Sequence, residues 1–203
     1  MSAMSASRIK LEEAAADVIQ YIKSLPEFRN SRAAVFGGLA LWKYMPRGRT
    51  TDDVDLIITV DGAPGAVKNR LLSAYGNVFT QRTQFFYYLS PSGIAIQIDI
   101  CAAAHSPYYP PALTVVGTIP PGSVPYIAPI DLIVFKVFCC GLRDNILKKT
   151  RDATDAENLL QQETARSGPF TLSSVQRTAF EGGFPDVLIY SDQDESWWRA
   201  RLR

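Results

Sequence analysis

Hydrophobic and polar positions follow two different periods along the chain, and each change of period predicts a change of secondary structure. Residues 8–25 carry apolar side chains at near-helical spacing, and Pro26 closes the run, which predicts an amphipathic helix. The short apolar run 33–36 predicts a strand that Gly37-Gly38 turns into a second helix. Because a residue before proline avoids helical conformation, we expect that second helix to stop before Pro46.

The middle of the chain alternates in the way that strands do. We expect a strand over 54–60, a crossover helix over 66–75, and a hairpin with arms at 84–90 and 94–100. In the second arm Gln97 and Asp99 fall on one face, because side chains two apart on a strand point the same way. This order of elements predicts an α/β fold in which a mixed sheet is flanked by helices.

Prolines mark the change to the last third of the chain. Seven of them fall within 105–129, so we expect a loop there with at most short strands at 113–116 and 126–127. Apolar periodicity then predicts three helices, over 130–142, about 151–165 and about 171–181. We therefore expect a core of residues 1–128 and a helical extension of residues 129–203, packed together as a single compact unit.

Composition narrows the class of protein. Of 203 residues, 47% are hydrophobic and 20% charged, as in soluble globular proteins. The net charge of +1 offers no overall attraction for nucleic acid, so an RNA partner would need a local basic patch. No apolar run approaches the ~20 residues that span a bilayer. We interpret Cys101, Cys139 and Cys140 as reduced core thiols, and expect a cytoplasmic protein without a membrane partner.

Carboxylates gather at the start of the strand predicted over 54–60. Asp53 and Asp55 share one face of that strand, while Asp52 points the other way. They could be ordinary solvated charges at a strand end. However, the run after them is apolar enough for a central strand, where two acids on one face are costly unless a cation neutralises them. Carboxylates that share Mg²⁺ with substrate phosphates are one common arrangement, and we favour it.

Two readings are open for the glycine pair at the preceding turn. Glycine tolerates positive φ and close backbone packing, so Gly37 and Gly38 could be purely structural. Alternatively, the unpaired N–H groups at the start of a helix attract phosphate, and glycines let a polyphosphate approach them.

The glycine pair and the acids together resemble the nucleotidyltransferase fold superfamily, whose signature is Gly-Gly or Gly-Ser at a helix start and then Asp-x-Asp on the next strand. The motif Arg49-x-Thr51-x-Asp53-x-Asp55-Leu56 is similar to the Arg-x-Thr-x-Asp-Ile-Asp-Leu motif of small nucleotidyltransferases that include the AbiEii-like toxin enzymes. Val54 replaces the isoleucine.

The resemblance implies a role for each of these residues. Gly37 and Gly38 would hold the β and γ phosphates of the nucleotide, with Arg49 and Thr51 also on the nucleotide-binding side. Arg49 could equally pair with Asp52. Asp53 and Asp55 would bind metal, and the third acid, expected on a neighbouring strand, would be Asp99. Its implied role is to bind a second metal and deprotonate the acceptor hydroxyl.

A second block carries the same resemblance. Pro129-x-Asp131-Leu132-Ile133-x-x-Lys136 is similar to a helix of these small enzymes in which the lysine reaches the triphosphate. Lys136 could instead snorkel from an otherwise apolar helix. Asp152 and Asp155 fall on one helical face, and we expect them to orient Lys136 or Lys148 rather than to bind metal.

The function implied is an enzyme that moves a nucleoside monophosphate from a nucleoside triphosphate such as ATP to a hydroxyl acceptor, with Mg²⁺ or Mn²⁺ as cofactor and release of pyrophosphate. The acceptor could be RNA, protein or a small molecule such as an aminoglycoside. The alternative is a noncatalytic nucleotide-binding or interaction module of the same fold. His105, the only histidine, is interpreted as a surface group.

Overall fold

The computed structural model describes residues 7–203, which form two compact units. The first contains the residues up to His105 together with Pro111–Ile127, and the second contains Ser106–Pro110 together with Ala128–Arg203. The loop Ser106–Pro110 belongs to the second unit, in part because the Tyr108 hydroxyl donates to Asp131 Oδ1 at 2.8 Å.

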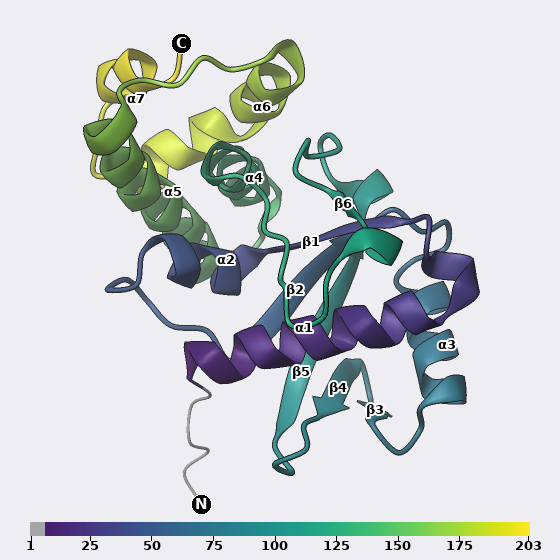
Figure 1. The fold of residues 1–203 in the computed structure, drawn as a ribbon. Helices are drawn as coiled ribbons and strands as arrows, with labels where there is room; N and C mark the ends of the chain where they lie inside the picture. The colour runs from purple at the N-terminus through teal and green to yellow at the C-terminus, as the bar shows by residue number, and fades with distance from the viewer. Residues whose placement is uncertain (1–6) are drawn as a thin grey trace, which may run out of the picture. The chain divides into compact units, whose positions relative to one another are not determined.

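A six-stranded mixed sheet forms the centre of the first unit, with the strand order β3-β4-β5-β2-β1-β6 (Figure 1). Strands β2 and β5 are parallel, and every other neighbouring pair is antiparallel. The α/β class with a mixed sheet and flanking helices is therefore confirmed. The strands are β1 (Arg32–Phe36), β2 (Asp53–Ile58), β3 (Phe79–Arg82), β4 (Phe85–Leu89), β5 (Ala95–Ala102) and β6 (Thr114–Val115).

Helices cover one face of this sheet and leave the acids on the other. Helix α1 (Arg8–Ser24) begins where the Ser7 side chain accepts from the backbone N–H of Lys10, and its apolar stripe is buried. Together with α3 (Gly65–Ala74) it packs on the apolar face of β2 and β5 (Figure 1). Helix α2 (Gly37–Tyr44) follows β1 directly. Short 3₁₀ turns lie at Pro26–Phe28, Ala103–His105 and Val116–Thr118.

The strand predictions need four corrections. Strand β3 was not predicted, because Phe79–Arg82 is short and carries only one buried apolar side chain. Strand β2 ends at Ile58, and β6 covers only two residues of the predicted 113–116. Instead of a strand at 126–127, Tyr126 forms an isolated bridge with Val35.

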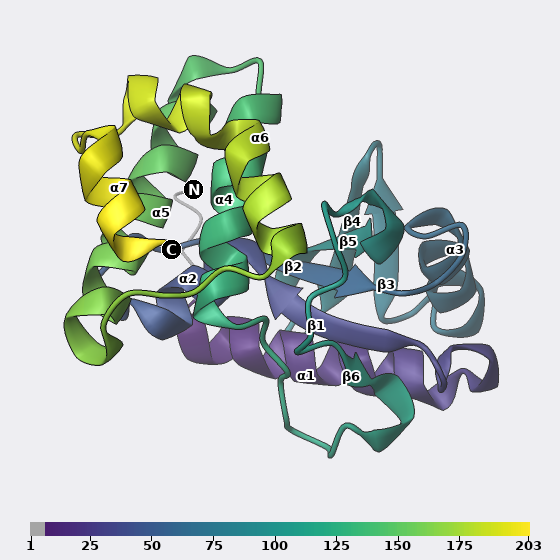
Figure 2. The same ribbon diagram turned by 90° about the horizontal axis from the view of Figure 1, so that it is seen from above.

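Four helices form the second unit (Figure 2): α4 (Pro129–Leu142), α5 (Ile146–Ser167), α6 (Ser174–Tyr190) and α7 (Glu195–Arg201). Helices α4 and α6 cross so closely that a Cβ added at Gly183 would lie 2.0 Å from the Val137 carbonyl oxygen. Glycine is therefore required at this crossing. Pro129 occupies the first turn of α4, where a missing N–H costs no helical hydrogen bond.

Two of the three predicted helical ranges in this unit were too short, and one helix was missed. Helix α5 begins at Ile146, because the Asn145 side chain caps it. The sequence did not predict this first turn, because Ile146 and Leu147 are 64% and 80% exposed and so do not fit the buried apolar pattern of the helix. Helix α6 continues to Tyr190 through Gly182, Gly183 and Pro185. The sequence reads these as breakers, but the packing against α4 needs a glycine at 183. Helix α7 was not predicted.

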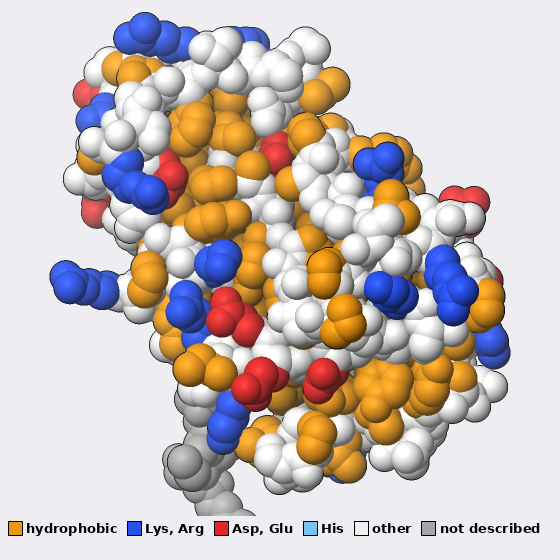
Figure 3. Space-filling view, viewed as in Figure 1, with side chains coloured by type: hydrophobic (Ala, Val, Ile, Leu, Met, Phe, Trp, Pro, Cys, Tyr) orange, Lys and Arg blue, Asp and Glu red, His pale blue; other side chains and the backbone are white. Residues whose placement is uncertain are grey.

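The surface and the cysteines agree in part with the composition. On the face in Figure 3, basic and acidic side chains are interspersed over α1, in keeping with the near-neutral net charge. Within residues 7–203, no helix is long and apolar enough to cross a membrane. The three cysteines form no disulfide, and Cys140 is a buried thiol as expected. Cys101 and Cys139 are only half-buried, so the interpretation as core thiols was wrong for them.

Candidate active site

Three carboxylates converge on the sheet face that α1 and α3 leave open. Asp53 and Asp55 lie on β2, and Asp99 lies level with Asp55 on the adjacent parallel strand β5. One carboxylate oxygen from each falls within 4.8 Å of the others, and all three side chains are half-buried. Val54 and Leu56 are buried on the opposite face, as the alternation of a strand requires. The sequence-predicted acids are thus brought together.

Each carboxylate is held by a different neighbouring donor. The Thr51 hydroxyl donates to Asp53 Oδ1, and the backbone N–H of Gly38 donates to Asp55 Oδ2 at 3.2 Å. The side-chain amide of Gln97 donates to Asp99 Oδ2 at 3.0 Å. These contacts hold one oxygen of each carboxylate in place and so also fix the orientation of its second oxygen.

Sequence reasoning did not assign a role to Gln97. It placed Gln97 on the same face as Asp99, and the register adds that Gln97 lies level with Asp53. The alternation of the strand could have revealed this contact, because a polar residue two positions before a candidate ligand lies within reach of its carboxylate.

The glycine pair is structural in both of the ways that glycine allows. Gly37 has φ +63°, and a Cβ built there would lie 1.8 Å from Asp55 Oδ2. A Cβ on Gly38 would lie 2.6 Å from the Thr51 hydroxyl oxygen. The start of α2 therefore approaches the acids as closely as it does only because these positions lack side chains. A role in holding phosphate is a separate question, and it stays a prediction.

Arg49 and Thr51 lie in the loop that enters β2. The half-buried Arg49 donates from Nη1 to the Thr50 carbonyl oxygen at 3.2 Å. Thr51 contacts Asp53 directly, so in this structure it positions a candidate metal ligand. Asp52 is exposed, because it precedes the first residue of β2 and does not follow Val54 and Leu56 into the core. The nucleotide-binding roles of Arg49 and Thr51 remain predictions.

Lys136 belongs to the second unit, where two acids of α5 hold it. Its ammonium group lies 2.7 Å from Asp152 Oδ1 and 2.9 Å from Asp155 Oδ2, and its side chain is 10% exposed. The snorkelling interpretation was therefore wrong, because the charged end is buried and paired. The expectation that Asp152 and Asp155 orient Lys136 is confirmed.

Asp152 is paired with a second cation besides Lys136. Arg143 also donates to it, from Nε to Oδ2 at 3.0 Å. Burial alone would raise the pKa of Asp152, but the charge and hydrogen bond of Lys136, together with Arg143, outweigh it and lower the pKa below its ordinary value. The carboxylate is thus held ionised by cations of the protein itself.

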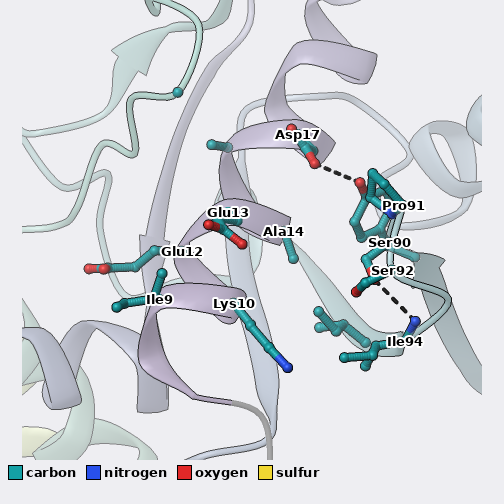
Figure 4. A pocket seen from close by; sticks show the side chains of 14 residues that line it. Ile9, Lys10, Glu12, Glu13, Ala14, Asp17, Ser90, Pro91, Ser92 and Ile94 are labelled. Atoms are coloured by element: carbon teal, nitrogen blue, oxygen red, sulfur yellow. Dashed lines mark hydrogen bonds between the residues drawn. The ribbon is translucent and has the colours of Figure 1, made fainter.

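Other features of the described residues do not adjoin the acids. His105 is exposed, as expected. A pocket of 580 Å³ opens between α1 and the β4–β5 hairpin, where the Tyr88 hydroxyl donates to Asp17 at 2.6 Å (Figure 4). Because Tyr88 and Ile96 line this pocket, it lies on the sheet face opposite to Asp99.

The acid cluster fits a divalent cation of the Mg²⁺ class. It supplies three carboxylate oxygens close enough to share one ion, the hard oxygen donors that Mg²⁺ and Mn²⁺ prefer. Within residues 7–203 it is the only group of three or more potential ligand residues that lies so close together.

Comparison with solved structures agrees with the fold. The chain resembles an antigenic nucleotidyltransferase-like protein from Paracoccidioides brasiliensis with a TM-score of 0.64 and 18% identity, over 95% of this chain and 94% of that one. The fold is nucleotidyltransferase-like.

Two structures of the antibiotic-resistance factor ANT(2'')-Ia match less well. Their TM-scores are 0.42 and 0.44 at 15% and 14% identity, covering 88% and 84% of this chain and 97% and 99% of theirs. One of them is in complex with adenylyl-2''-tobramycin. No protein-family model and no curated protein matches the chain, so the AbiEii-like branch is not confirmed.

Proposed function

We propose that this protein is a metal-dependent nucleotidyltransferase that moves a nucleoside monophosphate from a nucleoside triphosphate to a hydroxyl acceptor. The observation that carries the proposal is the convergence of Asp53, Asp55 and Asp99 beside the first turn of α2. A glycine turn in contact with a carboxylate cluster is what a site for a nucleotide and its metal ion requires.

The residues divide the work as follows. Asp53 and Asp55 would hold Mg²⁺ or Mn²⁺ together with the triphosphate, and Asp99 would complete the set on the acceptor side. The bound ion supplies charge neutralisation for the phosphates and lowers the pKa of the attacking hydroxyl. Thr51, Gly38 and Gln97 keep the carboxylates in place before the nucleotide arrives. Such preorganised charge is the main source of catalysis in phosphoryl chemistry.

The transfer step needs little covalent chemistry from the protein. The acceptor oxygen forms a bond to the α-phosphorus while the bond from that phosphorus to the pyrophosphate oxygen breaks. Asp99 accepts the proton of the acceptor hydroxyl, and pyrophosphate leaves with the electron pair of the broken bond. Because Gly37 and Gly38 let the first turn of α2 lie against Asp55 and Thr51, the departing phosphates would lie beside the start of this helix.

Two finer parts of the proposal rest on the sequence motifs. The Arg49-to-Leu56 motif supports membership of the small AbiEii-like enzymes, in which Arg49 and Thr51 would contact the nucleotide. The Pro129-to-Lys136 motif supports a contact between Lys136 and the triphosphate, whereas the pairing of Lys136 with the buried Asp152 and Asp155 supports a structural role, and the Lys136→Met variant decides between the two. We also propose a cytoplasmic location, which the absence of disulfides among the three cysteines supports.

Transfer of label tests this function. The protein would be incubated with each nucleoside triphosphate labelled at the α-phosphate, with Mg²⁺ or Mn²⁺, and with RNA, protein or metabolite fractions. We expect metal-dependent labelling of one fraction and none with Asp53→Asn/Asp55→Asn. A wild-type protein that binds nucleotide yet labels no fraction would identify a noncatalytic nucleotide-binding module instead.

A further inference from the structure

Strand β4 presents an unusual open face beside the acids. Phe86 and Tyr88 point into the core and are 0% and 2% exposed. The alternate residues Phe85 and Leu89 are 41% and 43% exposed, and Tyr87 between them is half-buried. Apolar and aromatic side chains that follow one another along an exposed strand face can mark a binding surface.

This open face continues the one that carries the acids. Tyr87 pairs with Gln97, which lies level with Asp53 and donates to Asp99. Because neighbouring strands lie about 4.8 Å apart, Tyr87 is one strand spacing from the Asp99 strand. Strands β4 and β5 are antiparallel, so moving back along β4 from Tyr87 to Phe85 corresponds to moving forward along β5 from Gln97 to Asp99. Phe85 is therefore on the Asp99 side of Tyr87.

A cation completes this surface. The exposed Arg82 of β3 places its guanidinium carbon 5.9 Å from the centre of the Tyr87 ring. Arginine can stack on an aromatic ring while its N–H groups bind phosphate. We call Arg82, Phe85, Tyr87 and Leu89 together the β4 platform.

We propose that the β4 platform binds the acceptor, and that the acceptor is a nucleotide, either free or at the end of a single-stranded nucleic acid. This inference rests on the proposed transferase function. A base would stack on Tyr87 and Phe85, its phosphate would meet Arg82, and a ribose hydroxyl would be directed toward Asp99. Stacking on exposed aromatic side chains of a sheet, with arginine at the phosphate, is how such ligands are recognised.

Arg82 lies on β3, two strands away from Asp99 on β5. The anionic phosphate of a nucleotide would therefore be held by the guanidinium, away from the carboxylates that would repel it.

Fluorescence anisotropy would test the platform. The probe is a short single-stranded RNA with a 5′ fluorophore and a free 3′ hydroxyl, with adenosine 5′-monophosphate as competitor. Tyr87→Ala and Arg82→Gln should each weaken binding about 5- to 100-fold, the range for one lost stacking or phosphate contact. Tyr87→Phe should bind as wild type does. Leu147→Ala, which changes an exposed leucine of α5, is the matched control.

The results distinguish a free nucleotide from a nucleic-acid end, and they test the platform proposal separately from the proposed transferase function. Label transferred to adenosine 5′-monophosphate would identify a free nucleotide as the acceptor, and label transferred only to the RNA would identify a nucleic-acid end. The platform proposal is wrong if wild type binds neither probe, if Tyr87→Ala binds as wild type does, or if transferred label appears on protein or aminoglycoside. Metal-dependent nucleoside triphosphate binding, measured on the same variants, should be unchanged; its absence from wild type would refute the proposed function independently of probe binding.

Discussion

Both units hold a cluster of carboxylates, but the two clusters are built differently. In the second unit, Asp152 and Asp155 are buried against Lys136, and Arg143 adds a further cation. In the first unit, the donors to Asp53 and Asp99 are a hydroxyl and a side-chain amide, and both acids are only half-buried. Cations of the protein balance the cluster in the second unit and make it a structural element, whereas the hydroxyl and amide donors to Asp53 and Asp99 leave the negative charge of these two acids available for a ligand.

The largest expected effect is on the structural cluster. Lys136→Met should lower the free energy of unfolding by about 3–5 kcal/mol, because it leaves two buried carboxylates without their shared cation. Denaturant unfolding would measure it. Arg70→Met removes an exposed pair with Glu27 and should change stability far less, because solvent screens exposed ion pairs. A stable Lys136→Met protein that binds nucleotide weakly would instead show that Lys136 contributes to triphosphate binding.

The next largest effect should be on turnover, at the open cluster. Asp99→Asn should reduce label transfer by about 10²-fold or more, the usual effect of removing a general base, while most of the nucleotide affinity remains. Transfer rates and nucleotide affinity would be measured on the same preparations. Asp61→Asn, at an exposed acid that follows β2, is the control. Equal transfer by wild type and Asp99→Asn would show that Asp99 is only a strand residue.

The clusters should also differ in their response to acid. Because the folded pKa of Asp152 is lowered, its stabilising contribution is complete above the ordinary carboxyl value of about 3.9 and is lost as the pH falls through the lower folded value. The stability difference between wild type and Asp152→Asn should therefore shrink as the pH drops through that range. A difference that stays constant with pH would contradict the ion-pair account.

The smallest effect should be on stability at the open cluster. Without metal, Asp53→Asn/Asp55→Asn should raise the thermal midpoint slightly, because it removes repulsion between neighbouring carboxylates while asparagine oxygens can still accept from Thr51 and Gly38. Thermal unfolding in chelator would show it. A clear loss of stability would mean that these acids are structural.

The two clusters were not equally predictable from the sequence. Asp53 and Asp55 followed from strand periodicity, which is local, and Asp99 followed from periodicity together with the resemblance, which places the third acid on a neighbouring strand. The burial of Lys136 could not be predicted, since it depends on how α5 packs against α4. For the same reason the sequence missed the full length of α6, where contact with α4 makes use of a glycine that normally breaks helices.

Calorimetric titration of the wild-type protein with a nonhydrolysable nucleoside triphosphate, in Mg²⁺ and then in chelator, tests the central claim most directly. If the acids of β2 and β5 form a shared site for metal and nucleotide, binding should be seen with Mg²⁺ and largely lost in chelator, and Asp53→Asn/Asp55→Asn should behave in Mg²⁺ as wild type does in chelator. Equal affinity of the wild-type protein with and without the metal would contradict the account.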